Sequence, residues 1–311
     1  SSAASDVYKR QVQAMSVFPF HQEVNYMTKP LFIWAGGKNK MLKHYIPILP
    51  SPLEMDIKSY VEPFFGGGAM FIHMMKNHKL KSVYINDINK DIVSIYSCIK
   101  NNYDEFLKRV VDLESKYLPL NTDDRRKLFF DVRHEHAYNY EDWSKPYESG
   151  TLYFLMKTGF NGIFQINKNT NNRYGTPCGL LNQKDKVFER DIVKWWNDVL
   201  QNVTITSGDW KNNIPDIKDA FYFFDPPYRD SFADYGNSFN DEQLKDLIDF
   251  ADKKDKVFIC NRDSSDGWFE LNKKSLNMKF FDITYTAGRR KKTKQGFEAK
   301  KAKEVLLWHM N

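Results

Sequence analysis

The feature that most constrains the fold is an alternation of strand, glycine turn, helix and strand in residues 58–87. Residues 59–61 predict a short strand, and a glycine turn follows at residues 66–68. Residues 69–76 (AMFIHMMK) predict a buried helix, and residues 82–85 predict the next strand. Two strands joined through a helix lie parallel in one sheet, and helices must cover such a sheet. We therefore predict an α/β fold built on an open, helix-covered sheet.

Strand signals return only late in the chain, after a long helical stretch. Apolar residues at helical spacing predict one helix over residues 91–106. Charged, aromatic and asparagine residues then predict mostly helices, with one hairpin-like loop, as far as about residue 202. Five later segments are expected to be strands: residues 203–206, 220–224, 256–260, 280–285 and 304–308.

The simplest account of this order is an α/β domain that is interrupted by a mostly helical insert. The domain then comprises residues 27–102 and 203–311, and the insert comprises residues 103–202, with the hairpin at about residues 160–179. We expect residues 1–26 to form a poorly ordered leader, because they are largely small and polar and lack the pattern of a signal peptide.

Composition excludes several classes of protein. The chain has 311 residues, of which 41% are hydrophobic, enough for a buried core. The net charge of +6 permits a polyanionic partner without requiring one. The three cysteines lie far apart and the histidines are scattered, so we expect no metal site and a reducing compartment, the cytoplasm. No apolar run approaches the roughly 18 residues of a membrane span, so we expect no membrane contact.

The glycine turn and an acidic residue after it indicate a nucleoside site. A glycine turn between strand and helix lets the backbone approach a ligand closely. Asp87 lies 19 positions after Gly68, at the end of the second strand, where an acid can hold ribose hydroxyls. The turn lacks the GxGxxG spacing, so a pyrophosphate cofactor is not favoured. The alternative is a tight turn with a strand-end aspartate and no ligand.

The sharpest chemical signal is the tetrapeptide Asp225-Pro226-Pro227-Tyr228, which follows an apolar strand. Two prolines cannot continue a central strand, and the carboxyl edge of a parallel sheet is where ligands bind. The Asp225 carboxylate and the Pro226 carbonyl can hold both hydrogens of an aromatic amine such as adenine N6, and Tyr228 offers a flat face for the base. This arrangement turns the amine lone pair toward a methyl donor and stabilises the charge that develops on nitrogen. The alternative is a proline-stiffened loop.

With both motifs present, the chain resembles the Dam-like adenine-specific DNA methyltransferases, whose motifs follow the order cofactor loop, recognition insert and DPPY. The resemblance runs from about residue 29 to the C-terminus. It implies a Rossmann-like class I methyltransferase sheet, an inserted DNA-recognition domain and direct methyl transfer from S-adenosyl-L-methionine to N6 of a flipped-out adenine. It is carried by WAGGK at residues 34–38, EPFFGGG at 62–68, NDIN at 86–89, SGDW at 207–210, DPPY at 225–228, AGRR at 287–290 and KEVLL at 303–307.

The resemblance also implies which residues form the site. Asp225, Pro226, Pro227 and Tyr228 would be the catalytic tetrapeptide. Asp87 would hold the cofactor ribose, in agreement with the spacing argument. The full set of implied cofactor-binding residues is Trp34, Gly37, Lys38, Pro63, Phe64, Gly66, Gly68, Asp87, Asp209 and Asp225.

Adenine N6 is paired inside duplex DNA, so the enzyme must flip the target base and grip the strand. Residues 159–179 resemble the family's recognition hairpin, in which Asn161-Gly162 and Asn171-Asn172 tolerate positive φ at turns. Arg173 is the best candidate to read a guanine edge, because its fork matches O6 and N7. The expected DNA-binding residues are Asn161, Gln165, Asn167, Arg173, Pro177, Arg289 and Arg290.

Two observations limit what the DNA side implies. Gln165, Asn172 and Cys178 stand where the family commonly has arginine, glycine and phenylalanine, so recognition of GATC does not transfer simply. The basic run that begins at Arg289 and Arg290 can neutralise phosphates, but it also fits a solvated lysine-rich loop. An ordinary surface hairpin is likewise the alternative for residues 159–179.

Two other functions stay open at this point. A methyltransferase of the same fold could act on RNA or protein, although such relatives commonly carry Asn-Pro-Pro-Tyr and this chain has Asp225. A catalytically silent DNA-binding relative is the second, but intact Trp34, Lys38, Asp87 and DPPY argue against it. We expect a monomer or weak dimer that acts on double-stranded DNA in a bacterium or is encoded by a phage or virus. A cognate restriction endonuclease would be a separate protein.

Overall fold

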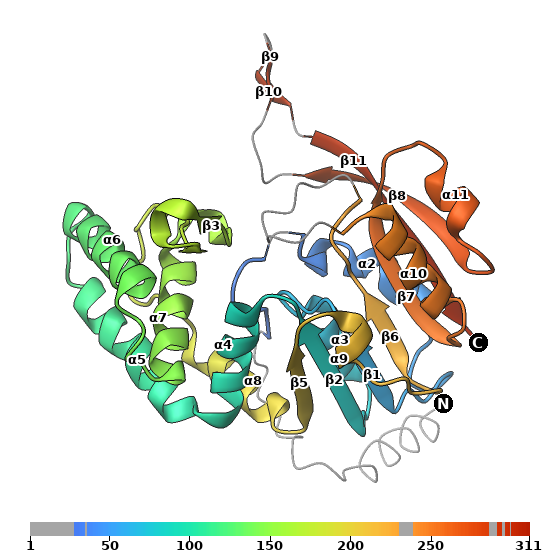
Figure 1. Cartoon of the computed structure of the whole chain (residues 1–311), viewed down its shortest axis with the longest axis horizontal. Coiled ribbons are helices and arrows are strands. Elements are labelled where there is room, and N and C mark those ends of the chain that lie inside the picture. The colour runs from blue at the N-terminus through green and yellow to red at the C-terminus, as the bar shows by residue number, and fades with distance from the viewer. Residues whose placement is uncertain (1–27, 35, 230–238, 286–290, 294–295, 299) are drawn as a thin grey trace, which may run out of the picture.

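The computed structural model describes residues 28–34, 36–229, 239–285, 291–293, 296–298 and 300–311. The leader expected over residues 1–26 lies outside them. The described chain forms a seven-stranded sheet flanked by helices, with a group of long helices to one side (Figure 1). The predicted Rossmann-like α/β architecture is confirmed.

The strand, glycine turn, helix and strand predicted at residues 58–87 form part of the sheet. β1 spans Ser59–Glu62, α3 spans Ala69–Asn77 and β2 spans Ser82–Asp87. β1 and β2 are parallel, with Val61 opposite Tyr84. Both strands therefore end at the same edge of the sheet, where the glycine turn lies.

The later strands predicted from the sequence are also present. They are β5 (Val203–Ser207), β6 (Phe221–Phe224), β7 (Lys256–Asp263), β8 (Asn277–Tyr285) and β11 (Lys300–Met310). The order across the sheet is β5-β2-β1-β6-β7-β11-β8. The first five of these are parallel, whereas β11 is antiparallel to both β7 and β8. The winding reverses between β1 and β6, which is where open parallel sheets bind ligands.

Side chains of the central strands alternate between two apolar layers, as expected for a sheet that is buried on both faces. Along β6, Phe221 and Phe223 belong to the larger core, whereas Tyr222 and Phe224 belong to a second core. The second core also includes residues of α9 (Trp210–Asn213), α10 (Asp241–Ala251) and α11 (Trp268–Asn272). The larger core is covered by α3, α4 (Lys90–Asn101), α8 (Arg190–Leu200) and the short helices α2 (Leu42–Tyr45) and η2 (Ile46–Ile48). The short helix η1 (Lys38–Lys40) precedes α2 and contacts α3.

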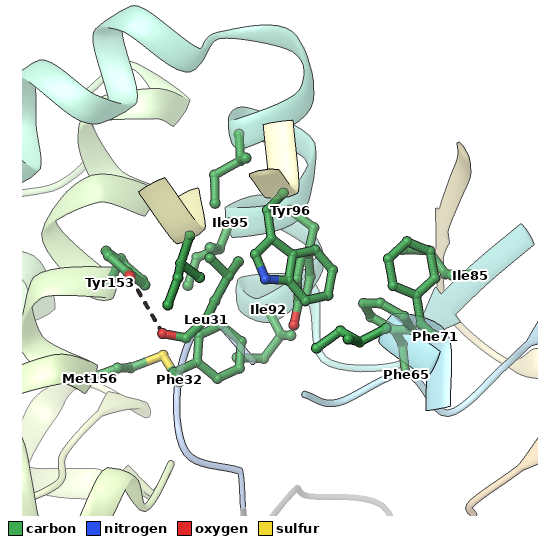
Figure 2. Packing of buried hydrophobic residues seen from close by; sticks show 14 of the residues in the cluster. Leu31, Phe32, Phe65, Phe71, Ile85, Ile92, Ile95, Tyr96, Tyr153 and Met156 are labelled. Atoms are coloured by element: carbon green, nitrogen blue, oxygen red, sulfur yellow. Dashed lines mark hydrogen bonds between the residues drawn. The ribbon is translucent and has the colours of Figure 1, made fainter. Parts of the chain in front are cut away.

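Three long helices lie together beyond α4, at the left of Figure 1: α5 (Tyr103–Tyr117), α6 (Thr122–Tyr138) and α7 (Lys145–Thr158). The larger core continues into them without a break. Figure 2 shows Leu31 and Phe32 between Ile92 of α4 and Tyr153 and Met156 of α7. The Tyr153 hydroxyl donates to the carbonyl oxygen of Leu31 at 3.4 Å. These helices are therefore packed against the sheet domain through a shared core.

Two short hairpins accompany the main sheet. β3 (Ile166–Asn167) pairs with β4 (Arg173–Tyr174), next to the short helices η3 (Phe160–Gly162) and η4 (Lys168–Thr170). β9 (Lys291–Thr293) pairs with β10 (Gly296–Glu298) and projects at the top of Figure 1. The first hairpin lies within the range predicted from the sequence.

The single helix predicted over residues 91–106 is wrong. The backbone leaves helical geometry at Asn102, with φ −136° and ψ 40°, and α4 and α5 are separate helices. Each of the two helices buries one apolar face, so the helical spacing of apolar residues is seen on both sides of Asn102. Periodicity alone therefore cannot detect a single non-helical residue between them. Within the range predicted for the insert, α8 packs against α4 and β5 of the sheet domain.

Candidate active site

The loops after β1, β2 and β5 are joined by one buried amide. Asn86, near the end of β2, donates from Nδ2 to the carbonyl oxygens of Pro63 at 3.1 Å and Gly208 at 3.0 Å. The N–H of Gly208 donates in turn to the carbonyl oxygen of Asp87 at 3.1 Å. The ends of three neighbouring strands are thereby fixed to one another at the edge where ligands bind.

Asp87 lies at this edge with its carboxylate turned toward the glycine turn. One carboxylate oxygen accepts the N–H of Gly66 at 2.8 Å, and the other accepts the N–H of Asn89 at 2.9 Å. Burial raises the pKa of Asp87, although hydrogen bonds from the backbone, including that of Gly66, act in the opposite direction. The glycine turn and its acid, which the spacing assigned to one ligand, are therefore in direct contact.

Two glycines of the turn leave no room for a side chain. Gly66 has φ +48°, and a Cβ at this position would lie 2.6 Å from the indole nitrogen of Trp34. Gly68 has φ +66°, and a Cβ there would lie 2.8 Å from the ring of Phe65 and 2.9 Å from that of Trp196. Both residues thus need the backbone freedom and the small size of glycine. Trp34 lies directly over the turn, so the two predicted cofactor segments are adjacent.

A second group of predicted residues meets at the end of β6. Nζ of Lys38 lies 2.5 Å from Oδ1 of Asp225 and donates to the Tyr228 hydroxyl at 3.0 Å. The Lys38 side chain is only 3% exposed, and its Nζ also lies 4.8 Å from the centre of the Tyr228 ring. The fold therefore joins the WAGGK and DPPY segments through a buried ion pair.

Burial and charge act against each other in this pair. Burial raises the pKa of Asp225 to about 6; the Lys38 ammonium lowers it, and the Glu304 carboxylate adds to the rise. Burial lowers the pKa of Lys38, but the negative charges of Asp225 and Glu304 outweigh this effect and the pKa lies above its ordinary value. At neutral pH the site therefore contains an ionised hydrogen-bond acceptor, the Asp225 carboxylate, paired with the Lys38 ammonium.

Two neighbours of Tyr228 were not predicted as site residues. The Tyr228 hydroxyl donates to Oε1 of Glu304 on β11 at 2.7 Å. The guanidinium carbon of Arg262 on β7 lies 4.6 Å from the centre of the Tyr228 ring. Glu304 is 1% exposed and directly precedes the apolar run of residues 305–308 in β11. A carboxylate directly before an apolar strand run is the sequence signal that could have found it.

The remaining predicted cofactor residues lie in the loops after β1 and β5 and in the segment before η1. The Pro63 carbonyl accepts from Asn86, and Phe64 packs against Trp210 with ring centres 6.3 Å apart. Gly37 donates to the carbonyl oxygen of Trp34 at 3.0 Å. Asp209 is exposed and its side chain accepts the N–H of Lys211 at the start of α9.

Comparison with known proteins decides the family. A family model described as D12 class N6 adenine-specific DNA methyltransferase matches residues 34–296. The chain belongs to this family. It therefore transfers a methyl group to N6 of adenine in DNA, as the residues and the resemblance predicted.

Named relatives agree with the family match. This methyltransferase is similar to the type II methyltransferase M.MjaIII of Methanocaldococcus jannaschii, with 33% identity over 73% of this chain and 81% of that protein. It is similar to the type II methyltransferase M.CviBI of Paramecium bursaria Chlorella virus NC1A, with 28% identity over 71% of this chain and 78% of that protein. It is also similar to the DNA adenine methylase of Escherichia coli K12, with 25% identity over 83% and 90%.

The methyltransferase carries the predicted hairpin beside α6 and α7. Asn161, Asn171 and Asn172 have φ between 52° and 54°, so the asparagines expected to tolerate positive φ do adopt it. Gln165, Asn167 and Pro177 are exposed. The Pro177 carbonyl accepts the N–H of Phe160 at 2.8 Å, which closes the hairpin at its base.

Arg173 does not project from the hairpin. Its guanidinium forms an ion pair with Glu148 of α7, lies 3.3 Å from Nε2 of His136 and stacks 3.6 Å from the centre of the Tyr140 ring. The Arg173 side chain is 14% exposed. Burial, followed by the charge of Arg173, lowers the pKa of His136 to about 4, so the imidazole is neutral. The geometry makes Arg173 an anchor of the hairpin, and reading a base would require it to leave Glu148.

Arg173→Ala is expected to lower the free energy of unfolding by about 2 to 3 kcal/mol, less than for a fully broken buried pair, because the Glu148 carboxylate loses Arg173 but keeps Lys145 at 2.9 Å. Chemical denaturation measures this effect, with the exposed Gln165→Ala as a control that changes stability by less than about 0.5 kcal/mol. DNA affinity should fall similarly for all sequences. Unchanged stability together with an altered preference for one base pair would instead identify Arg173 as a base reader.

One exposed aromatic residue of the hairpin was not predicted. Phe160 is 45% exposed, beside Asn161, and Ile33, which directly precedes the WAGGK segment, is 68% exposed. Ile33 lies against the hairpin, because a Cβ on Gly162 would be 2.4 Å from its Cβ. An aromatic residue immediately before an asparagine-glycine turn was the available sequence signal.

The expectations for the basic run, metal sites and membrane contact can be compared only with the described residues. Arg289 and Arg290 lie outside the described residues. Among the residues that are described, no group of three or more histidine, cysteine, aspartate or glutamate side chains is arranged to hold a metal ion. No helix in the described ranges has the length and apolar character needed to cross a membrane.

Proposed function

We propose that this methyltransferase uses S-adenosyl-L-methionine as methyl donor and transfers the group directly to a flipped-out adenine in double-stranded DNA. The cofactor supplies an electrophilic methyl group on a positively charged sulfur. The observation that carries the proposal is the meeting of Lys38, Asp225 and Tyr228 beside the point where the winding of the sheet reverses. A cation, an anionic acceptor and an aromatic face are thus in contact where a ligand is expected.

The residues at the carboxyl edge fit a cofactor that carries a ribose. Asp87 already accepts two backbone N–H groups, and a carboxylate has capacity for further hydroxyl donors. The close approach of Trp34 to Gly66 forms one wall beside it. We propose that the cofactor is held by Trp34, Gly37, Lys38, Pro63, Phe64, Gly66, Gly68, Asp87, Asp209 and Asp225.

The catalytic work falls to the tetrapeptide. Oδ1 of Asp225 accepts from Lys38, and the carboxylate can offer Oδ2 to one hydrogen of the adenine amine. The Pro226 carbonyl takes the other hydrogen, so the amine is held on two sides and its lone pair is exposed. The negative charge of Asp225 then stabilises the positive charge that develops on N6. Pro227 stiffens the turn, and the Tyr228 ring stacks on the base.

On the DNA side we propose that residues 103–202 serve as the target-recognition insert. Asn161, Gln165 and Asn167 lie exposed on the hairpin, where side chains can reach base edges. An exposed apolar side chain such as Phe160 can fill the gap that a flipped base leaves in the stack. We further propose that Arg289 and Arg290 contact DNA phosphates. Arg173 and Pro177 would hold the hairpin in its DNA-binding conformation.

The names of the relatives suggest the biological setting. Two of them are type II methyltransferases, so we propose that this chain works in a restriction–modification system with a cognate endonuclease as a separate protein. We also propose that the protein acts on duplex DNA as a monomer or weak dimer. We propose the cytoplasm as its compartment, because bacterial DNA lies there.

The proposed function is tested by incubating the purified protein with unmethylated genomic DNA and S-adenosyl-L-methionine, followed by single-molecule sequencing for N6-methyladenine. We expect one enriched motif, and none with Asp225→Ala. A GATC core would show that the altered hairpin reads DNA as its relatives do. A folded protein that binds cofactor and DNA but leaves no N6-methyladenine would identify a silent relative and refute the proposal.

A further inference from the structure

The antiparallel strand β11 brings two charged side chains to Tyr228. Glu304 of β11 is paired with Arg262 of β7, and residues directly opposite each other in an antiparallel pair share a face of the sheet. Both reach the same aromatic residue: Glu304 accepts its hydroxyl at 2.7 Å, and the Arg262 guanidinium carbon lies 4.6 Å from its ring centre. Tyr228 is therefore held at its hydroxyl and at its face.

The contact with Glu304 continues into the catalytic pair. The Tyr228 hydroxyl also accepts from Lys38 at 3.0 Å, and Lys38 contacts Asp225 at 2.5 Å. Hydrogen bonds therefore connect four side chains in sequence, from β11 to the end of β6: Glu304, Tyr228, Lys38 and Asp225. Glu304 and Lys38 are both at least 97% buried, so their charges act on one another with little screening by water.

We propose that Glu304 is a positioning residue for methyl transfer, which fixes the Tyr228 hydroxyl and, through Lys38, the orientation of the Asp225 carboxylate. The inference rests on the proposed roles of Asp225 and Tyr228. It adds a distinct claim, because stacking on adenine needs only the ring of Tyr228, whereas the contact with Glu304 uses its hydroxyl. Glu304 itself does not touch the substrate.

Tyr228→Phe separates the two claims, since it keeps the ring and removes the hydroxyl. We expect a loss of kcat of about 10-fold for Tyr228→Phe and of about 10- to 100-fold for Glu304→Ala, the range for losing one hydrogen bond to a charged group. The KM for DNA and the affinity for S-adenosyl-L-methionine should stay within about 3-fold of the native values. In the Tyr228→Phe background, Glu304→Ala should cost much less than it does alone, because the shared hydrogen bond is already gone.

A pH profile supplies a readout that a structural role would not move. Lys38 contacts Asp225 and connects it to Tyr228. The other titratable groups that interact electrostatically with Asp225 are Glu304, Cys260, Tyr45 and Glu62. Of these, the Glu304 carboxylate adds to the raised pKa of Asp225. Glu304→Gln keeps an oxygen acceptor for Tyr228 but removes the charge. The acid limb of kcat/KM should therefore move to lower pH in Glu304→Gln.

Glu114→Gln is the matched control, because Glu114 is 6% exposed in α5 and accepts the N–H of Val187, far along the chain from the catalytic turn. It should leave the acid limb where it is. Additive losses in the double variant together with an unmoved acid limb in Glu304→Gln would overturn the inference, even if Asp225→Ala is inactive. An active Asp225→Ala would instead refute the proposed chemistry itself, so the two failures are distinguishable. Thermal denaturation of each variant confirms that the protein is folded.

Discussion

Replacing Asp225 by alanine is expected to lower the rate of methyl transfer to DNA by about 100- to 1000-fold. Removing a single preorganised hydrogen-bonding group from a site of developing charge has an effect of this size. Alanine removes both an acceptor of the adenine amine and the charge that stabilises positive N6. The measurement is a single-turnover transfer of labelled methyl groups to a duplex oligonucleotide that contains the recognition site. Cofactor affinity, measured by calorimetry, should change by less than about 10-fold.

Because Asp225 is paired with the buried Lys38, the Asp225→Ala experiment needs a control for loss of folding. Lys38 is 3% exposed, so alanine at position 225 leaves its ammonium with Tyr228 and the Gly36 carbonyl oxygen as the remaining acceptors. A buried cation that loses its counter-ion destabilises a protein strongly. Asp225→Asn retains an oxygen that can accept from Lys38 and is the variant of choice if alanine unfolds the chain. A folded Asp225→Asn enzyme with native turnover would contradict the assigned role.

The same assignment predicts how turnover depends on pH. The neutral acid keeps one acceptor oxygen, but only the ionised Asp225 has the negative charge that stabilises positive charge on N6. Because burial raises the pKa of Asp225 to about 6, kcat/KM should be constant near neutral pH and fall as pH decreases through about 6. A profile that stays flat to pH 5 would show that another group carries the charge.

The positions of the strands along the chain could be predicted from local pattern, because most of them are apolar runs bounded by turn residues. Successive side chains of β6 are all apolar and point to opposite faces, with Phe221 in one core and Tyr222 in the other, as in a sheet that is buried on both faces. Residues that follow such strands meet at one edge, so Asp87 and Asp225 were each expected where ligands bind, and the resemblance to the family assigned both to one cofactor site. Local pattern failed at Asn102, where one non-helical residue separates two helices of similar periodicity.

Contacts between distant segments could not be predicted in the same way. That Glu304 meets Tyr228 depends on β11 entering between β7 and β8 in a register that pairs it with Arg262. A shift of one residue would turn Glu304 to the opposite face of the sheet. Nothing within β11 itself specifies that register.

Arg173 illustrates a different limit. A hairpin arginine suggests an exposed side chain, and the fork of its guanidinium matches a guanine edge. The same fork matches a carboxylate, and α7 presents Glu148 to it. Which partner it takes is a property of the tertiary arrangement of α6, α7 and the hairpin, so residue type and local pattern do not decide between the two.

Asp87→Ala is expected to weaken the binding of S-adenosyl-L-methionine by about 30- to 300-fold. The proposed role of the carboxylate is to accept the two ribose hydroxyls, and each hydrogen bond to a charged acceptor contributes about 1.5 to 3 kcal/mol in a site shielded from water, with incomplete additivity for the pair. Isothermal titration with the cofactor in the absence of DNA measures the effect directly. At saturating cofactor, kcat should fall by less than about 5-fold, because Asp87 has no proposed role at the adenine amine.

A second role of Asp87 makes its controls necessary. Its carboxylate also accepts the N–H groups of Gly66 and Asn89, so alanine loosens the glycine turn as well as removing a ligand for ribose. Asp87→Asn keeps one oxygen acceptor and should bind the cofactor with intermediate affinity. Asp209→Ala tests the same sheet edge at an exposed carboxylate and should weaken binding by about 10-fold or less, since water competes for an exposed hydrogen bond. Native cofactor affinity in a folded Asp87→Ala protein would remove Asp87 from the site, and an equal loss in kcat would place it at the chemistry instead.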